Sequence, residues 1–155
     1  MNPRPLQIHL SMRTRLIYWL YLVGLLHFLA GLALPLMANG ALFSSYHDMV
    51  DSTFWREIVP TGVRPLQVWW LSLFGATIQS LGLWMLALIR LGDIHHSRFA
   101  WSILSVGLLL WAPQDMWISY QAGVTLHVWI DLLALICLLP PLLVLRWIDR
   151  EHESD

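Results

Sequence analysis

The sequence predicts an all-α integral membrane protein, folded as a bundle of four transmembrane helices. Hydrophobic residues make up 57% of the 155 residues and charged residues only 12%. Soluble domains carry about twice that charged share, roughly 25%. Four apolar stretches are each long enough to cross a bilayer, which takes about 20 residues. We therefore expect one membrane domain spanning residues 1–155.

The apolar runs place the four helices and leave one long connection, an outer loop over residues 38–64. The first run exceeds the ~7–15 residues of a signal-peptide core, so we expect an uncleaved helix there. Gly92 is a typical helix stop, and bends are expected at Pro113 and at Pro140–Pro141. The expected helices cover about residues 16–37, 66–91, 98–120 and 124–148.

Apolar side chains recur every four residues within the outer loop, at Tyr46, Val50, Phe54 and Ile58. Ser45, with Asp48 three residues later, is typical of a helix N-terminus. This pattern predicts a short amphipathic helix near residues 45–58, on the membrane surface or over the mouth of the bundle. A surface-packing helix is favoured over a gating lid, because connections usually run over the surface.

The arginines fix the expected orientation, because loops rich in Arg and Lys stay in the cytoplasm. Only two of the nine, Arg56 and Arg64, fall on the side of the long loop. Both termini should then be cytoplasmic, and the predicted location is the cytoplasmic (inner) membrane of a bacterium. The inner arginines are Arg4, Arg13, Arg15, Arg90, Arg98, Arg146 and Arg150.

A polar stretch, residues 111–131, interrupts the last two apolar runs and carries Asp115, His127 and Asp131. Ionisable groups at membrane depth are costly and indicate function. Asp115 lies seventeen residues from Arg98, or roughly 25 Å along a helix. Asp131 lies fifteen from Arg146, or roughly 22 Å. The two carboxylates should therefore meet at similar depth, where they resist double ionisation.

We expect these residues to line a ligand pocket that opens to the outer side. His27 lies between Gly24 and Gly31 on one face of the first helix, and small residues of that kind indicate helix packing. A packing role is therefore favoured for His27 alone. The same holds for Gln79, which belongs to a stripe of small residues that includes Gly75. The expected ligand-binding residues are Asp115, Asp131, His127, His27, Gln79, Trp111 and Trp129.

Several other chemistries lack their residues. The single cysteine, Cys137, permits no intrachain disulfide. His95 and His96 have no third ligand nearby, so no metal site is expected. The sequence carries no phosphate-binding glycine loop, HExxH motif or serine nucleophile signature. A net charge of −1 gives no argument for nucleic acid, and haem is disfavoured because His27 and His127 differ by roughly 10 Å in depth.

Four spans, a long first connection and a short third loop resemble the layout of two families of small membrane proteins. One is the DoxX-like family, for which the resemblance implies quinone-linked or thiol-related functions. The other is the EXPERA group of sterol-isomerase and sigma-2-receptor type proteins, which implies acidic residues in a lipid-facing pocket. The EXPERA acidic residues lie mainly in the first two helices, where this chain has His27 and Gln79.

The favoured function is a non-enzymatic membrane protein that binds a small amphipathic or cationic ligand, or a membrane protein partner, in its outer half. One alternative is a quinone-linked redox or proton-transfer enzyme or accessory that uses the carboxylate–histidine group. Another is a structural subunit of a larger membrane complex. A quinone or chromophore that co-purified would favour the first alternative, and loss of a stable partner would favour the second.

Overall fold

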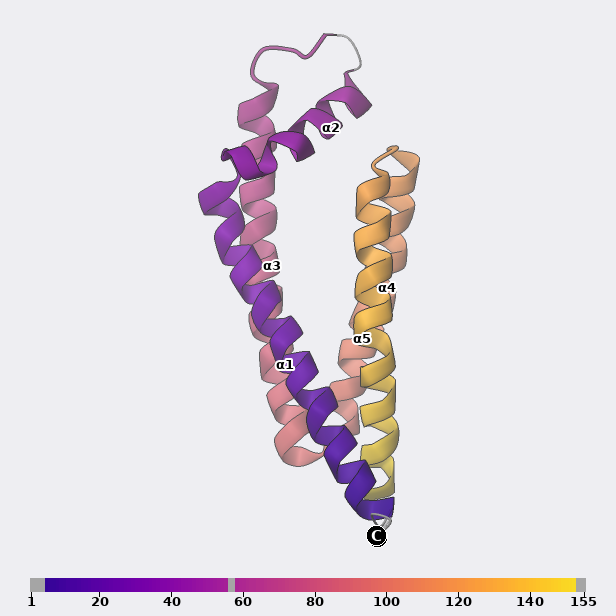
Figure 1. Cartoon of the computed structure of the whole chain (residues 1–155). Helices are drawn as coiled ribbons and strands as arrows, with labels where there is room; N and C mark the ends of the chain where they lie inside the picture. The colour runs from indigo at the N-terminus through magenta and orange to yellow at the C-terminus, as the bar shows by residue number, and fades with distance from the viewer. Residues whose placement is uncertain (1–4, 56–57, 153–155) are drawn as a thin grey trace.

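The computed structural model describes residues 5–55 and 58–152, and within them it contains helices and no strands. Side chains are described for residues 12–55 and 58–150. Four long helices and two short ones follow in order (Figure 1). They are α1 (Pro5–Met37), the 3-10 helix η1 (Ala41–Phe43), α2 (Ser44–Phe54), α3 (Val63–His95), α4 (Arg98–Gln121) and α5 (Thr125–His152).

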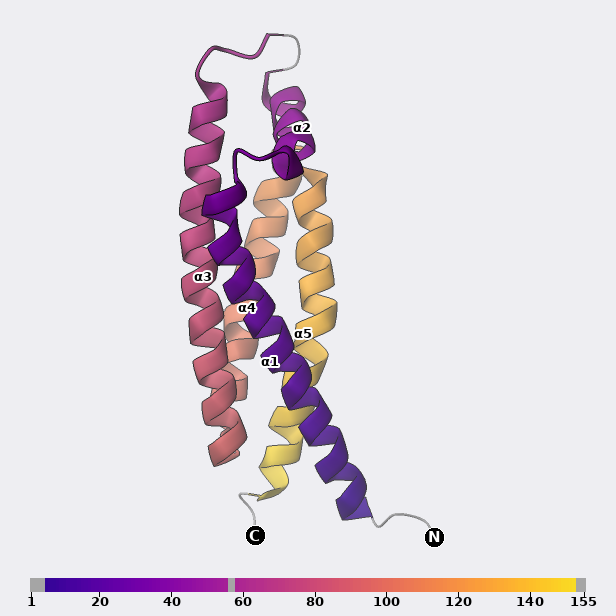
Figure 2. The same ribbon diagram turned by 60° about the vertical axis from the view of Figure 1, so that its left-hand side comes forward.

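The long helices form two pairs, α1 with α3 and α4 with α5. Figure 1 shows the pairs together near the chain termini and diverging toward the opposite end, and both views place α2 at that opposite end (Figure 2). We call these ends the terminal end and the α2 end. Because the pairs diverge, the inward-facing side chains at the α2 end are not covered by the opposite pair of helices.

Glycines bring α1 and α3 into close contact. A methyl group on Gly31 would collide with the backbone of Gln79, and one on Gly75 would lie 2.7 Å from the Cβ of Leu34. A methyl group on Gly82 would lie 2.5 Å from the backbone nitrogen of Phe28. Such close approach is the usual basis of helix association in membranes. The stripe around Gly75 and Gln79 is therefore a packing face, as its composition predicts.

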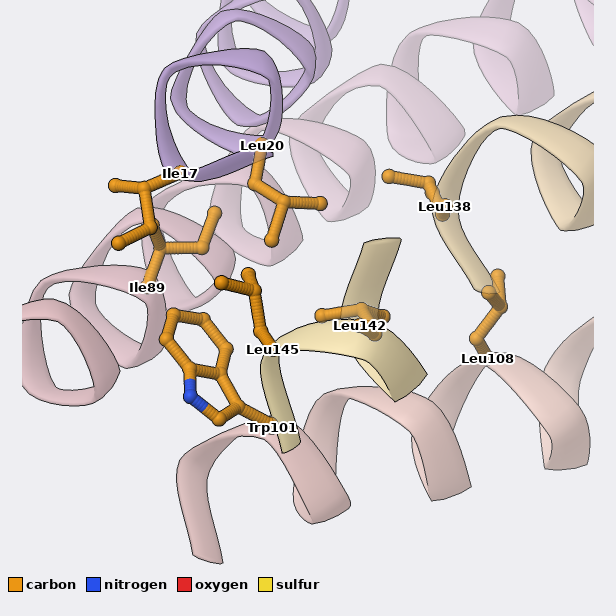
Figure 3. Packing of buried hydrophobic residues seen from close by; sticks show 8 residues of the cluster. All are labelled: Ile17, Leu20, Ile89, Trp101, Leu108, Leu138, Leu142 and Leu145. Carbon is orange, nitrogen blue, oxygen red and sulfur yellow. The ribbon is translucent and has the colours of Figure 1, made fainter. Parts of the chain in front are cut away.

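A hydrophobic core joins all four long helices at the terminal end (Figure 3). Trp101 of α4 is fully buried and packs on Gly92 of α3, where a methyl group would strike the indole ring. This core fixes the ends of the two pairs relative to each other. It consists of Ile17, Leu20, Ile89, Trp101, Leu108, Leu138, Leu142 and Leu145.

Three helices extend beyond the ends that the sequence predicts. The first helix begins at Pro5 rather than near residue 16. The second continues past Gly92 to His95, because Gly92 serves the contact with Trp101 while His96 makes the turn in the left-handed conformation. The last helix reaches His152 rather than ending near residue 148, and its final turns carry the fully buried Asp149.

Three of the described helices are long and apolar enough to cross a membrane: Met12–Met37, Val63–His95 and Thr125–Arg150. Helix α4 is not among them. Its second half carries Pro113, Gln114 and Asp115, which interrupt the apolar run. The structure thus supports a membrane protein with three candidate spans, and the fourth helix packs along α5.

Candidate functional site

At the terminal end, a buried ion pair links the first and last helices. The Arg13 side chain donates from Nε to Asp149 Oδ1 at 2.8 Å and from Nη2 to Asp149 Oδ2 at 3.3 Å. It also donates to the backbone oxygens of Gly92 and Asp93, at 3.2 and 3.1 Å. Arg13 is only 8% exposed and Asp149 is fully buried. Each charge therefore has a partner that offsets the cost of desolvation.

Two further groups complete the pairing of Asp149. Trp101 donates its indole N–H to Asp149 Oδ2 at 2.7 Å, and His96 Nδ1 lies 3.2 Å from Asp149 Oδ1. Groups from α1, from α4 and from the turn between α3 and α4 thus meet at one carboxylate of α5. This satisfied cluster is a clasp that holds the terminal end together.

The clasp is not among the sequence-predicted sites. The sequence assigns Arg13 only to the arginines that orient the protein in the membrane, and it predicts that the last helix ends just before Asp149. The sequence contains a pattern that indicates the burial of Asp149. Leu142, Leu145 and Asp149 are separated by three and then four residues, as on one face of a helix, and both leucines are buried. That register continues the buried face of the helix to Asp149.

At the α2 end, Tyr46 contacts His127 and lies near Asp115, and Asp115 in turn lies near Asp131. Asp115 and Asp131 lie close enough to interact electrostatically. Asp115 accepts a 3.4 Å hydrogen bond from the hydroxyl of Ser119, one turn away on α4. Both carboxylates lie on the buried faces of their helices, because Asp115 follows buried Leu108 and Ala112, and Asp131 precedes buried Leu138.

Asp131 differs from every other buried carboxylate in the described part of the chain. It is 2% exposed, yet its Oδ2 has no hydrogen-bond partner among the described residues. A buried carboxylate oxygen without a donor is costly, by about 1–3 kcal/mol or more for a charged group. No group in the described part of the chain offsets this cost for Asp131 Oδ2. This unpaired oxygen is therefore the strongest indication that a ligand binds here.

Tyr46 of α2 covers this group of residues. Its ring stacks on His127, with the centroids 5.9 Å apart and the planes 10° from parallel. Burial raises the pKa of the Tyr46 hydroxyl above its ordinary value of 10.0, and the Asp115 carboxylate raises this pKa further. The hydroxyl therefore stays protonated and is a hydrogen-bond donor beside the carboxylates.

A separate apolar cavity of about 240 Å³ lies nearer the terminal end, between the two helix pairs. His27 and Trp111 line it together with leucine side chains such as Leu108 and Leu138. The His27 Nδ1 atom lies 3.1 Å from the backbone oxygen of Val23, which can only accept a hydrogen bond. Gly107 also faces this cavity, and a methyl group added there would meet no atom within 4 Å.

The expected site residues thus separate into three groups. Asp115, Asp131 and His127 meet under α2, whereas His27 and Trp111 line the apolar cavity. Gln79 does not line this cavity and lies against Gly31 through its backbone; the Trp129 side chain is 67% exposed. No group of three His, Cys, Asp or Glu side chains that could hold a metal occurs among the described residues.

No protein-family model, curated protein or solved structure matches this chain.

Proposed function

We propose that this protein is a four-span membrane protein that binds a small amphipathic cation. The cationic group lies at Asp131 and Asp115, and the apolar part extends into the cavity beside His27. The α2 end faces the outside and the termini face the cytoplasm, in keeping with the seven of nine arginines that the sequence assigns to the inner side. In this arrangement α4 crosses the membrane beside α5, with Asp115 turned away from lipid.

The unpaired, buried carboxylate of Asp131 carries the proposal. A ligand ammonium group supplies both the missing charge and the missing donor, and charge-assisted hydrogen bonds are about twice as strong as neutral ones. Asp115 adds a second negative charge close to the first. Both features favour a cation over an anion or a neutral group.

The apolar cavity supports the amphipathic character of the ligand. Trp111 of the cavity lies one helical turn from Asp115, and Leu138 lies two turns from Asp131. These separations correspond to roughly 6 and 10 Å along the helices. A cavity of about 150 Å³ holds benzene in a well-studied protein, so one of about 240 Å³ accommodates a larger apolar group.

The test uses the purified chain in lipid nanodiscs, with decylamine as the probe and decanol as its uncharged control. We expect saturable binding of the amine, measured by tryptophan fluorescence. Its affinity should be at least about tenfold above that of the alcohol, the smallest effect expected of a hydrogen bond to a charged group. Asp131→Asn should abolish this preference, because the substitution removes the charge and keeps the volume.

Gly107→Leu is the matched variant for the apolar part. It fills the cavity without touching the carboxylates, so it should weaken both probes equally. The proposal is wrong if the native protein binds amine and alcohol alike, or if Asp131→Asn keeps the preference for the amine.

A further inference from the structure

A chain of three hydrogen bonds ties α2 to the ends of α1 and α3. His47 of α2 is 1% exposed. Its Nε2 lies 2.8 Å from the backbone oxygen of Ala38, and its Nδ1 lies 2.8 Å from Oε1 of Gln67. The Gln67 amide nitrogen in turn donates to the carboxylate of Asp51, one turn further along α2. The chain therefore runs Ala38, His47, Gln67, Asp51.

The three hydrogen bonds of this chain need one more proton than a neutral histidine and an ionised aspartate carry together. The Ala38 oxygen only accepts, so it takes the proton on His47 Nε2. If Gln67 donates to ionised Asp51, its oxygen faces His47, and Nδ1 must also carry a proton. If the amide is turned over, its oxygen faces Asp51, which must then be protonated. In either orientation the pair of His47 and Asp51 has no net charge.

Charged groups of α2 and α3 lie beside this chain. Arg64 of α3 lies 3.4 Å from Asp51 Oδ2 and 3.3 Å from the carboxylate of Asp48. The extra proton belongs to the chain as a whole, in either orientation of the Gln67 amide.

The same segment of α2 reaches the other helix pair. Tyr46, next to His47, stacks on His127 of α5 and interacts with Asp115 of α4. Thr53, near the end of α2, lies 3.5 Å from where a methyl group on Gly123 would sit, in the turn between α4 and α5. Helix α2 thus lies across the α2 end with contacts to both pairs, where the pairs diverge (Figure 1, Figure 2).

We propose that α2 docks across both helix pairs when the His47–Gln67–Asp51 chain holds its extra proton, and that α2 is released when this proton is lost. We call α2 in this role the strap. Deprotonation leaves one of the three bonds without its hydrogen and gives the pair of His47 and Asp51 a net negative charge, next to the buried His47 ring. Histidine is the side chain whose charge ordinarily changes between about pH 5 and 8. Docking therefore weakens as pH rises, by at most about tenfold per pH unit because one proton is involved. The proposal does not depend on any ligand.

The experiment measures the position of α2 by the distance between two spin labels. Ser52→Cys on α2 and Gln121→Cys at the end of α4 are both exposed positions, and Cys137→Ser removes the native thiol. The labelled chain is placed in nanodiscs at about pH 4.5 and about pH 8.5, on either side of the ordinary histidine range. We expect one short distance at the lower pH and a second, longer population at the higher pH.

Asp51→Asn is the decisive variant. An asparagine amide donates to the Gln67 oxygen, so the Gln67 amide donates to His47 and a neutral His47 donates to Ala38. All three bonds then form without the extra proton. This variant should stay docked at both pH values, although His127 and Tyr46 are unchanged. His95→Gln, at an exposed histidine of the terminal end, should keep the native response.

Two outcomes overturn the proposal. In the first, the native distances do not change with pH. In the second, Asp51→Asn keeps the native pH response, or releases α2 at both pH values as expected if only the ion pair with Arg64 held it.

Discussion

Each end of the bundle contains a group of buried polar side chains, and the two groups differ in how completely they are paired. The terminal-end clasp surrounds Asp149 with Arg13, Trp101 and His96. The α2-end group holds Asp131 equally deep in the protein, but one of its carboxylate oxygens has no donor. The same residue type is thus satisfied at one end and unsatisfied at the other.

This difference separates a structural role from a binding role. A fully paired charge cluster fixes one arrangement of the helices and leaves nothing for a ligand to add. An unpaired buried carboxylate lowers stability until a partner arrives, which is the usual condition of a binding site. Substitutions at the two aspartates should therefore have opposite effects on the free energy of unfolding.

The largest effect is expected for Asp149→Asn. This change leaves the buried guanidinium of Arg13 with only the partly exposed carboxylate of Asp93, at 3.4 Å. Breaking a buried ion pair costs about 3–5 kcal/mol. Unfolding in mixed micelles with increasing dodecyl sulfate should shift to a much lower midpoint. Asp48→Asn removes a carboxylate whose side chain is 71% exposed, so its effect should stay below about 1 kcal/mol. A small effect at Asp149 would show that the clasp is not a structural element.

The same substitution at Asp131 should act in the other direction. Asp131→Asn removes a charge that lacks a partner, so we expect no loss of stability and a gain of up to about 2 kcal/mol. The measurement is the same micelle titration, without any added amine. A loss comparable to that of Asp149→Asn would remove the distinction between the two ends and would indicate a second structural cluster.

The sequence predicts the α2-end carboxylates better than the clasp, for a physical reason. Helical rise is constant and adjacent helices run antiparallel, so counting residues from Arg98 and Arg146 places Asp115 and Asp131 at one level, and the structure brings them within electrostatic reach. The pair of Arg13 and Asp149 joins residues 136 positions apart. No local pattern specifies which helices exchange that contact.

The hydrogen-bond chain that holds the strap cannot be predicted from the sequence, for a related reason. The periodic residues Tyr46, Val50, Phe54 and Ile58 predict a helix near residues 45–58. Helix α2 covers only Ser44–Phe54, so Ile58 lies beyond its end. His47 falls outside that stripe, and its partners Ala38 and Gln67 belong to other elements. The apolar cavity is likewise a product of how the helix pairs diverge, which depends on the glycines between α1 and α3 and on the core around Trp101.

The smallest effect concerns Tyr46, which tests how closely α2 packs on the acidic group. Burial, and after it the charge of Asp115, raise the pKa of this tyrosine. The folded state then holds the phenolic proton more tightly than the unfolded chain does. The resulting stabilisation is complete below the ordinary tyrosine pKa of 10.0 and is lost as pH rises through the higher pKa of the folded state.

When pH is raised from below 10 to above 10, the free energy of unfolding should consequently decrease more in the native protein than in Tyr46→Phe, which has no phenolic proton to lose. Tyr120→Phe is the control, since Tyr120 is well exposed and lies at the end of α4. In Asp115→Asn the pKa of Tyr46 should decrease but remain above the ordinary value, because burial is the larger cause. An ordinary pKa for Tyr46, followed by phenolate absorbance, would mean that α2 does not cover the carboxylates. The α2 end would then be open to water, and the unpaired oxygen of Asp131 would no longer indicate a ligand.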